Sequence, residues 1–97
     1  MEVVRNLPDE EIISGLNPGK RTEEMLRSLY RGYFESLSWY VMNNSGSRQD
    51  AEDIFQEVVV SFIDLVQKGK FRGDSSIKTF LYSMNRHTWL NELKRRG

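Results

Sequence analysis

Residues able to perform catalysis are scarce in this chain of 97 residues, which has one histidine and no cysteine. Enzymes need a nucleophile with its base, paired carboxylates in a cleft, or a metal ion. His87 stands on a predicted helix without an obvious orienting partner, so a packing or surface role is the more ordinary interpretation. Neither a Glu-x-x-His pair nor a phosphate-binding glycine loop occurs. The sequence therefore predicts no catalytic residue, no metal site and no cofactor, and a protein that is not an enzyme.

Acidic side chains gather near the middle of the chain. At helical spacing, residues 50–57 place several of them on one edge of a helix. Such a run is ordinarily a solvated face whose first carboxylates complement the helix dipole. Like charges without partners also suit docking on a basic partner. Sequence physics alone leaves both interpretations open. The edge consists of Asp50, Asp53 and Glu57, with Glu52 and Gln56 beside them.

The C-terminal stretch has the opposite charge and interleaves basic with aromatic residues. Residues 71–97 carry 6 Lys and Arg against 2 Asp and Glu, whereas residues 1–70 carry 8 against 12. Cations bind phosphates and aromatic rings stack on unpaired bases, so this pattern suits single-stranded nucleic acid. The ordinary alternative is aromatic core packing, with cations complementing the helix C-terminus. The residues predicted to face outward are Lys78, Tyr82, Asn85, Arg86, an exposed Trp89 and Arg96, after a loop residue, Phe71.

Four helices are predicted to position these residues. Pro8 and the acidic residues after it begin a short helix over about residues 8–16. Apolar residues spaced by three and four predict long helices over about 21–44, 48–68 and 76–96. The β-prone run of valines at 58–60 is outweighed by its helical flanks. The predicted fold class is therefore all-α, a compact bundle of three long helices preceded by a short N-terminal helix.

Capping signals and buried stripes refine these helices. Residues 47–50 approximate a capping box, Ser45-Gly46 supplies a left-handed cap, and one of residues 74–76 caps the last helix. The predicted core residues are Met25, Leu29, Tyr33, Leu37 and Tyr40, flanked by Leu26, Tyr30, Phe34 and Val41, on the first long helix; Ala51, Ile54, Phe55, Val58, Phe62 and Leu65 on the second; and Ile77, Phe80, Leu81 and Met84 on the last, with less regular continuation through Leu90 and Leu93.

Length and composition limit the class of protein. Ninety-seven residues with 38% hydrophobic content support a single domain with one core. Apolar runs fall far short of the roughly 20 residues that a membrane span needs, and no signal-peptide core follows the N-terminus. The absence of cysteine fits a reducing compartment. The chain is expected to be soluble and cytoplasmic, with no membrane insertion.

Three motifs occur in order and together resemble a known family. They are Asp50-Ala51-Glu52-Asp53-Ile54-Phe55-Gln56-Glu57, then Phe71-Arg72-Gly73-Asp74-Ser75, then Lys78-Thr79-Phe80-Leu81-Tyr82-Ser83-Met84 with Asn91-Glu92-Leu93-Lys94-Arg95-Arg96. They are similar to conserved region 2 of the extracytoplasmic-function (ECF) group of bacterial sigma-70-type sigma factors. The resemblance extends from about Asp9 to Arg96. It implies one helical region 2 domain over residues 1–97, acting in transcription initiation.

The resemblance implies two partners. In that family the acidic helix docks on the clamp helices of the largest subunit of core RNA polymerase. The following loop and last helix melt the promoter minus-ten element and hold a flipped base of the non-template strand. The resemblance also allows an anti-sigma factor as a further partner. Carried onto this chain, the polymerase contacts are Asp50, Glu52, Asp53, Gln56 and Glu57, and the DNA contacts are Phe71, Arg72, Gly73, Asp74, Ser75, Lys78, Tyr82, Arg86, His87, Asn91 and Lys94.

The chain departs from the family pattern at three points. Phe80-Leu81-Tyr82 replaces Trp-Leu-Tyr, which leaves a core role intact. His87 takes the place of the asparagine that touches the flipped base, so the base preference stays open. The second domain of the family, region 4, is missing, which predicts that the chain is one part of a longer protein. An alternative hypothesis is a sigma-derived protein-interaction domain that keeps the polymerase-docking face without DNA melting.

Overall fold

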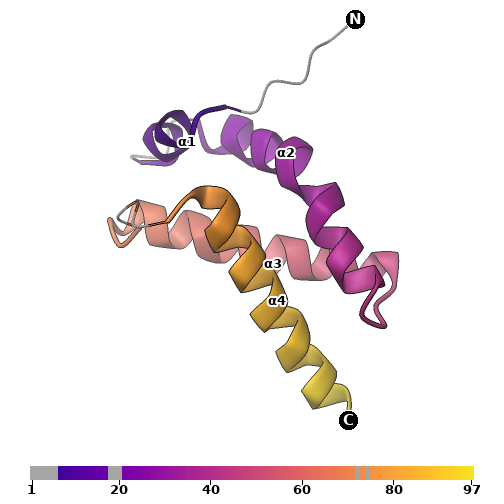
Figure 1. Cartoon of the computed structure of the whole chain (residues 1–97). Helices are drawn as coiled ribbons and strands as arrows, with labels where there is room; N and C mark the ends of the chain where they lie inside the picture. The colour runs from indigo at the N-terminus through magenta and orange to yellow at the C-terminus, as the bar shows by residue number, and fades with distance from the viewer. Residues whose placement is uncertain (1–6, 18–20, 72, 74) are drawn as a thin grey trace, which may run out of the picture.

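Four α-helices form the computed structural model, which describes residues 7–17, 21–71, 73 and 75–97. Within these residues no strand occurs, so the all-α prediction is confirmed. Each helix begins and ends within two residues of its predicted bounds. In Figure 1, α4 crosses α3, and the C-terminal end of α4 lies far from α1. The helices are α1 (Asp9–Leu16), α2 (Thr22–Met42), α3 (Arg48–Gln67) and α4 (Ile77–Arg96).

Side chains cap the helices that carry the predicted contacts. The Ser47 hydroxyl accepts the Asp50 N–H at 3.0 Å and the Asp50 carboxylate accepts the Ser47 N–H at 2.9 Å, which completes the predicted capping box. Ser76 caps α4 by accepting a backbone N–H of its first turn at 3.1 Å. In the turn after α2, the residue with left-handed backbone is Ser45, with φ of 75°. The start of α3 and of α4 is thereby fixed.

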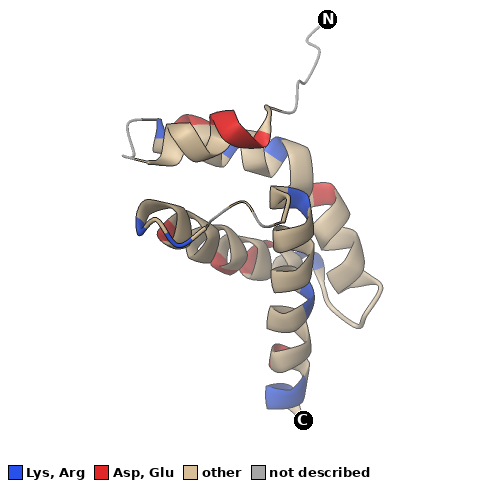
Figure 2. Ribbon diagram, turned by 60° about the vertical axis from the view of Figure 1, so that its left-hand side comes forward, with Lys and Arg blue, Asp and Glu red and all other residues tan. Residues whose placement is uncertain are grey.

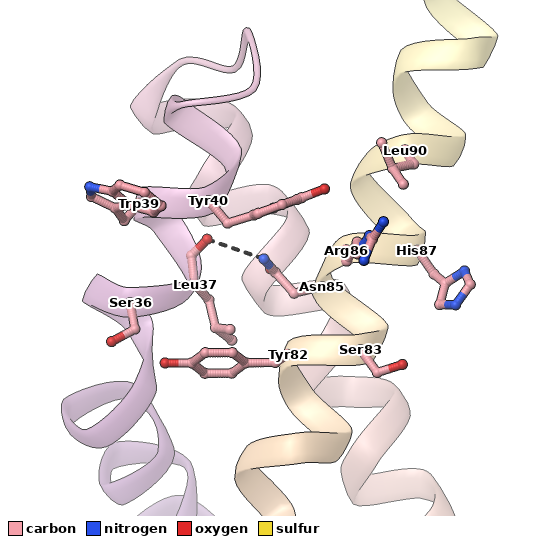
Figure 3. Close-up of a pocket in the computed structure, with 10 residues that line it drawn as sticks. All are labelled: Ser36, Leu37, Trp39, Tyr40, Tyr82, Ser83, Asn85, Arg86, His87 and Leu90. Carbon is pink, nitrogen blue, oxygen red and sulfur yellow. Dashed lines mark hydrogen bonds between the residues drawn. The ribbon is translucent and has the colours of Figure 1, made fainter.

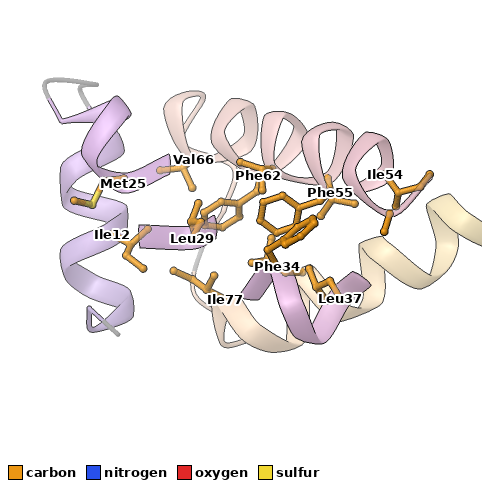
Figure 4. Packing of buried hydrophobic residues seen from close by; sticks show 14 of the residues in the cluster. Ile12, Met25, Leu29, Phe34, Leu37, Ile54, Phe55, Phe62, Val66 and Ile77 are labelled. Carbon is orange, nitrogen blue, oxygen red and sulfur yellow. The ribbon is translucent and has the colours of Figure 1, made fainter. Parts of the chain in front are cut away.

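The core lies between α2, α3 and α4, and α1 adds Ile12 and Leu16 to it (Figure 4). Aromatic rings join the helices, since Phe34 of α2 meets Phe55 of α3 edge-on with ring centres 5.2 Å apart. Burial of these apolar surfaces is the main stabilising contribution. Among the predicted core residues, Leu26 and Tyr30 are exposed, so their placement in the core was wrong. Others are only partly buried: Tyr33, Tyr40, Leu65, Phe80, Met84, Leu90 and Leu93. The buried hydrophobic residues are Ile12, Leu16, Met25, Leu29, Phe34, Leu37, Val41, Ala51, Ile54, Phe55, Val58, Val59, Phe62, Val66, Ile77, Leu81 and Trp89.

The second half of α4 turns a different face inward from the one predicted. Asn85 and Trp89, expected on the outward side, are 1% and 0% exposed. The Trp89 indole donates from Nε1 to the Asn44 carbonyl at 2.9 Å, and the Asn85 amide donates to the Leu37 carbonyl at 3.1 Å. Polar atoms on this face can be buried because α2 and the turn after it offer backbone acceptors. The prediction that Asn85 and Trp89 face outward was therefore wrong.

Gly46 makes room for that tryptophan. A Cβ atom at Gly46 would lie 2.9 Å from Cζ2 of Trp89 and would also collide with Val41. The turn between α2 and α3 can therefore press directly on the indole ring, which anchors α4 to both helices. Among the described helices, none combines the length with the apolar character that crossing a bilayer requires.

Candidate nucleic-acid interface and docking surface

The acidic edge predicted on α3 occupies the first half of that helix (Figure 2). Asp53, Gln56 and Glu57 are exposed, whereas Glu52 is partly buried. The Asp53 carboxylate accepts a hydrogen bond from the Gln49 amide at 2.9 Å, which orients the carboxylate without neutralising it. In the described part of the chain, no group of acidic or histidine side chains could hold a metal ion. The edge therefore presents negative charge suited to a basic partner.

Asp50, the first residue of the predicted edge, is held by α4. Its carboxylate forms a two-pronged ion pair with the Arg96 guanidinium, with N–O distances of 2.7 and 3.2 Å. Arg96 also contacts the Glu92 carboxylate at 3.0 Å and lies over the Trp89 ring at 5.1 Å. Hydrogen bonds from Arg96 and Ser47 hold the pKa of Asp50 well below its usual value. Arg96, expected on the nucleic-acid side, instead closes this contact, which we call the Asp50–Arg96 clamp.

An apolar groove adjoins the acidic edge and runs between α2 and α3. Leu26, Tyr30 and Val60 are 37%, 49% and 65% exposed, which is unusual for large apolar side chains close together. They line a hollow of about 360 Å³ that also includes Gln56 of the acidic edge. Sequence reasoning missed this α2–α3 groove. The spacing of apolar residues could have indicated it. Leu26 and Tyr30 lie beside the row of buried residues on α2, and Val60 lies outside the row of buried residues on α3.

The predicted DNA contacts on α4 all lie at its surface. Lys78 places its ammonium nitrogen 5.7 Å from the centre of the Tyr82 ring, so a cation and an aromatic ring stand together. In Figure 3 the His87 imidazole points away from α2, whereas Tyr82 extends toward it. The helix therefore presents cations and a ring at its surface, on more than one side. The exposed residues are Lys78, Tyr82, Arg86, His87, Asn91 and Lys94.

The loop before α4 is anchored by an aromatic residue. Phe71 is partly buried and meets the rings of Phe62 and Phe80 with centres 5.1 and 5.4 Å away. Gly73 has a φ of 75°, a backbone conformation that favours glycine. Ser75 is exposed. Two further predicted contacts, Arg72 and Asp74, lie outside the described residues.

A small hollow of about 350 Å³ lies beside that loop, and we call it the loop pocket. Its walls include Asp9 and Glu10 of α1, which the sequence did not connect with the loop. Asp9 accepts the Ile77 N–H at 2.9 Å and so supports the start of α4. Burial raises the pKa of Tyr33, and the nearby Asp9 carboxylate and Tyr82 contribute to this rise. The loop pocket thus combines polar walls with a local negative charge.

A larger hollow of about 720 Å³ lies between α2 and α4. Figure 3 shows Tyr40 of α2 and Tyr82 of α4 extending between the two helices, with Arg86 close by. Trp39 also lines the hollow, and in this view its ring extends to the side of α2 away from α4. Trp39 is 67% exposed. Sequence reasoning missed this α2–α4 groove, although Trp39 stands off the buried stripe of α2 and could have been recognised as an outward residue.

A comparison with known families decides what these surfaces belong to. Residues 25–97 match the family model of sigma-70 region 2. The chain belongs to the sigma-70 region 2 family. It is also similar to the RNA polymerase sigma factor YlaC of Bacillus subtilis (strain 168), with 31% identity over 72 residues. That alignment covers 74% of this chain and 40% of YlaC, so the chain spans about two fifths of the length of this relative. No solved structure gives a significant match.

This membership confirms the resemblance to region 2 of ECF sigma factors. Sigma factors are transcription initiation factors and not enzymes, in agreement with the scarcity of catalytic groups. The matched residues include nearly all of α2 and the whole of α3 and α4. They therefore contain the acidic edge, both grooves and the α4 surface. The individual contact residues stay predictions.

Proposed function

We propose that this chain docks on core RNA polymerase through α3 and holds single-stranded promoter DNA through the loop and α4. The family match carries this proposal, because residues 25–97 contain both surfaces. In detail, the acidic edge contacts the clamp helices of the largest polymerase subunit. The loop and α4 melt the minus-ten element and bind its non-template strand. A domain with this function acts on the chromosome, so we place the protein in the bacterial cytoplasm.

The docking half of the proposal rests on charge and apolar surface side by side. Asp53 and Glu57 are exposed carboxylates of the acidic edge, and Gln56 joins that edge to the α2–α3 groove. Specific interfaces commonly place an apolar centre within a polar rim. The groove would supply the centre and the carboxylates the rim. Asp50 would act by the clamp, which fixes α4 against α3, more than by direct contact with polymerase.

The DNA half rests on the surface of α4 and on the loop pocket. Extruding a base costs a few kcal/mol of unstacking, which stacking and polar contacts can offset. Lys78 and Tyr82 supply a cation and a ring at the start of α4. Glu10 lines the loop pocket with an acceptor that suits the exocyclic amino group of cytosine or adenine.

One experiment tests docking by reversing charge on the acidic edge. The double variant Asp53→Arg with Glu57→Arg should bind purified core polymerase at least tenfold more weakly in a pull-down or by biolayer interferometry. Asp64→Arg is the matched control, because it reverses a charge on the same helix two turns beyond Glu57. It breaks only an exposed ion pair with Lys68, which contributes little to stability. Unchanged affinity of the double variant would refute the docking proposal.

A second experiment tests DNA binding with a labelled single-stranded oligonucleotide and fluorescence anisotropy. Affinity should fall as salt rises, since phosphate contacts release counterions. Lys78→Ala should weaken binding without harming the fold, because Lys78 is exposed. Phe71→Ala is a poor probe, since Phe71 packs on Phe62 and Phe80 and its loss would disturb the core.

The alternative function keeps polymerase docking without DNA melting. The observation that favours it is the pair of carboxylates in the loop pocket, because negative charge near the loop opposes a phosphate backbone. Its signature would be normal polymerase binding together with oligonucleotide affinity that does not respond to salt or to Lys78→Ala.

A further inference from the structure

The α2–α4 groove has the composition of a base-binding site and lies apart from the loop pocket. We infer that this groove seats a nucleobase of single-stranded DNA, with Trp39 of α2 as a stacking surface. The inference rests on the proposed DNA-binding function and adds a second helix to its interface. Sequence reasoning confined the DNA contacts to the loop and α4.

Exposed aromatic surface is the first observation in its favour. Trp39 is 67% exposed and Tyr82 is 39% exposed, and both border the same hollow as the partly buried Tyr40. An exposed aromatic ring buries apolar surface when a flat partner stacks on it, and every nucleobase has a flat face. The groove volume of about 720 Å³ lies within the range of pockets that hold small molecules.

The charge of the side chains that line the groove favours an anionic ligand. The lining of the α2–α4 groove includes one cation, Arg86, and no carboxylate, whereas the loop pocket includes Asp9 and Glu10. A phosphate backbone would therefore meet attraction at the groove. A neutral apolar peptide could use the rings, but it would gain nothing from the cations Lys78 and Arg86 on α4.

The path from the loop to the groove is continuous along α4. Lys78, Tyr82 and Arg86 are four residues apart and therefore share one face of the helix. Eight residues of helix rise about 12 Å, which is about the length of three or four stacked nucleotides. A strand that leaves the loop would thus follow this face and reach the groove within a few nucleotides.

Asn85 supplies a polar group to the lining of the groove. Its amide nitrogen is bound to the Leu37 carbonyl. Its Oδ1 atom is the one buried side-chain oxygen or nitrogen without a hydrogen-bond partner in the described part of the chain. Such an acceptor is unfavourable when left alone. Because Asn85 is 1% exposed, this acceptor lies beneath the surface of the groove and does not by itself select one base.

Anisotropy and intrinsic fluorescence test the inference with a labelled single-stranded deoxyoligonucleotide of minus-ten composition. Trp39→Ala should weaken binding by about 5- to 150-fold, the usual effect of losing one stacked base. Met42→Ala is the matched control, because Met42 is exposed on α2 close to Trp39 but does not line the groove. In the parent chain the oligonucleotide should quench tryptophan emission. In Trp39→Phe the quenching should disappear, since Trp89 is buried.

The outcomes separate this inference from the proposed function. If Lys78→Ala weakens salt-dependent binding but Trp39→Ala matches Met42→Ala, the α4 surface binds DNA and the groove inference is wrong. If the parent chain binds no oligonucleotide at any salt concentration, both fail. If Trp39→Ala lowers affinity for core polymerase and not for DNA, the groove binds protein, which also overturns the inference.

Discussion

The two grooves that flank α2 differ in chemistry although they share a wall. The α2–α4 groove has aromatic rings and Arg86 around it, and its lining contains no carboxylate. The α2–α3 groove also includes an arginine, Arg27, but it has Leu26, Tyr30 and Val60 at its surface and adjoins the acidic edge. We propose a different partner for each, an anionic strand for the first and a basic protein surface for the second. One amphipathic helix can therefore serve two interfaces, provided that α3 and α4 are held on either side of it.

The two tryptophans show how the α2–α4 groove is built. Trp89 is buried under the turn after α2 and fixes the distance between α2 and α4, while Trp39 stands exposed at the edge of the hollow. One ring maintains the groove and the other is available to a ligand. This division suggests variants that remove one groove and leave the other intact.

The largest effect is expected from Trp89→Ala. Removing a fully buried tryptophan and its hydrogen bond to Asn44 should lower the free energy of unfolding by about 3–5 kcal/mol. Urea unfolding followed by circular dichroism measures the change. Trp39→Ala, at an exposed position, should change it by less than about 0.5 kcal/mol. Equal losses in the two variants would contradict the assignment of one ring to the core and the other to the surface.

A substitution in the α2–α3 groove should weaken the binding of polymerase and leave the binding of DNA unchanged. Leu26→Asp adds a charge where we propose an apolar contact, and binding to core polymerase should fall by about 10-fold, or about 1.4 kcal/mol. Oligonucleotide affinity should stay unchanged, because Leu26 does not line the α2–α4 groove. Leu26→Met, which keeps the apolar character, is the control. A parallel loss of DNA binding in Leu26→Asp would show that the two grooves do not act separately.

Arg86→Ala should have the opposite effect: weaker binding of DNA with unchanged binding of polymerase. Arg86 is exposed, so its removal should leave stability and polymerase binding near the parent values. The plot of log affinity for single-stranded DNA against log salt should become shallower by about 0.7, the change for one phosphate contact. Anisotropy titrations at four or five salt concentrations provide the slope. An unchanged slope would mean that Arg86 faces no phosphate, and would weaken the case for a strand running along α4.

The sequence predicted the fold more completely than the sites. Regular spacing of apolar residues and local caps such as Ser47 are properties of neighbouring residues, so helices and caps followed from them directly. The inward face of α4 depended on Gly46 and on backbone acceptors in α2, which are distant in sequence, and Trp89 was placed on the wrong side. Trp39 and the α2–α3 groove were missed for the same reason, since a groove exists only after two helices have packed.

The smallest effect concerns the Asp50–Arg96 clamp, which holds α4 against α3. Arg96 and Ser47 stabilise the charged carboxylate and so depress the pKa of Asp50 in the folded state. A depressed pKa contributes stability above the unfolded value, near 3.9, and this contribution is lost as pH falls below it. The stability difference between the parent and Asp50→Asn should therefore be greatest at neutral pH and shrink below about pH 4.

Urea unfolding of both proteins at pH 7 and pH 3 measures this difference. Asp64→Asn is the control, because it removes a carboxylate of the same helix whose ion pair with Lys68 is exposed on both sides. If the clamp also sets the position of α4, Asp50→Asn should weaken oligonucleotide binding slightly at neutral pH. The α2–α3 groove, which includes Leu26, should keep its structure. A stability difference that is the same at both pH values would mean that Asp50 acts only through the capping hydrogen bond, which asparagine can also make.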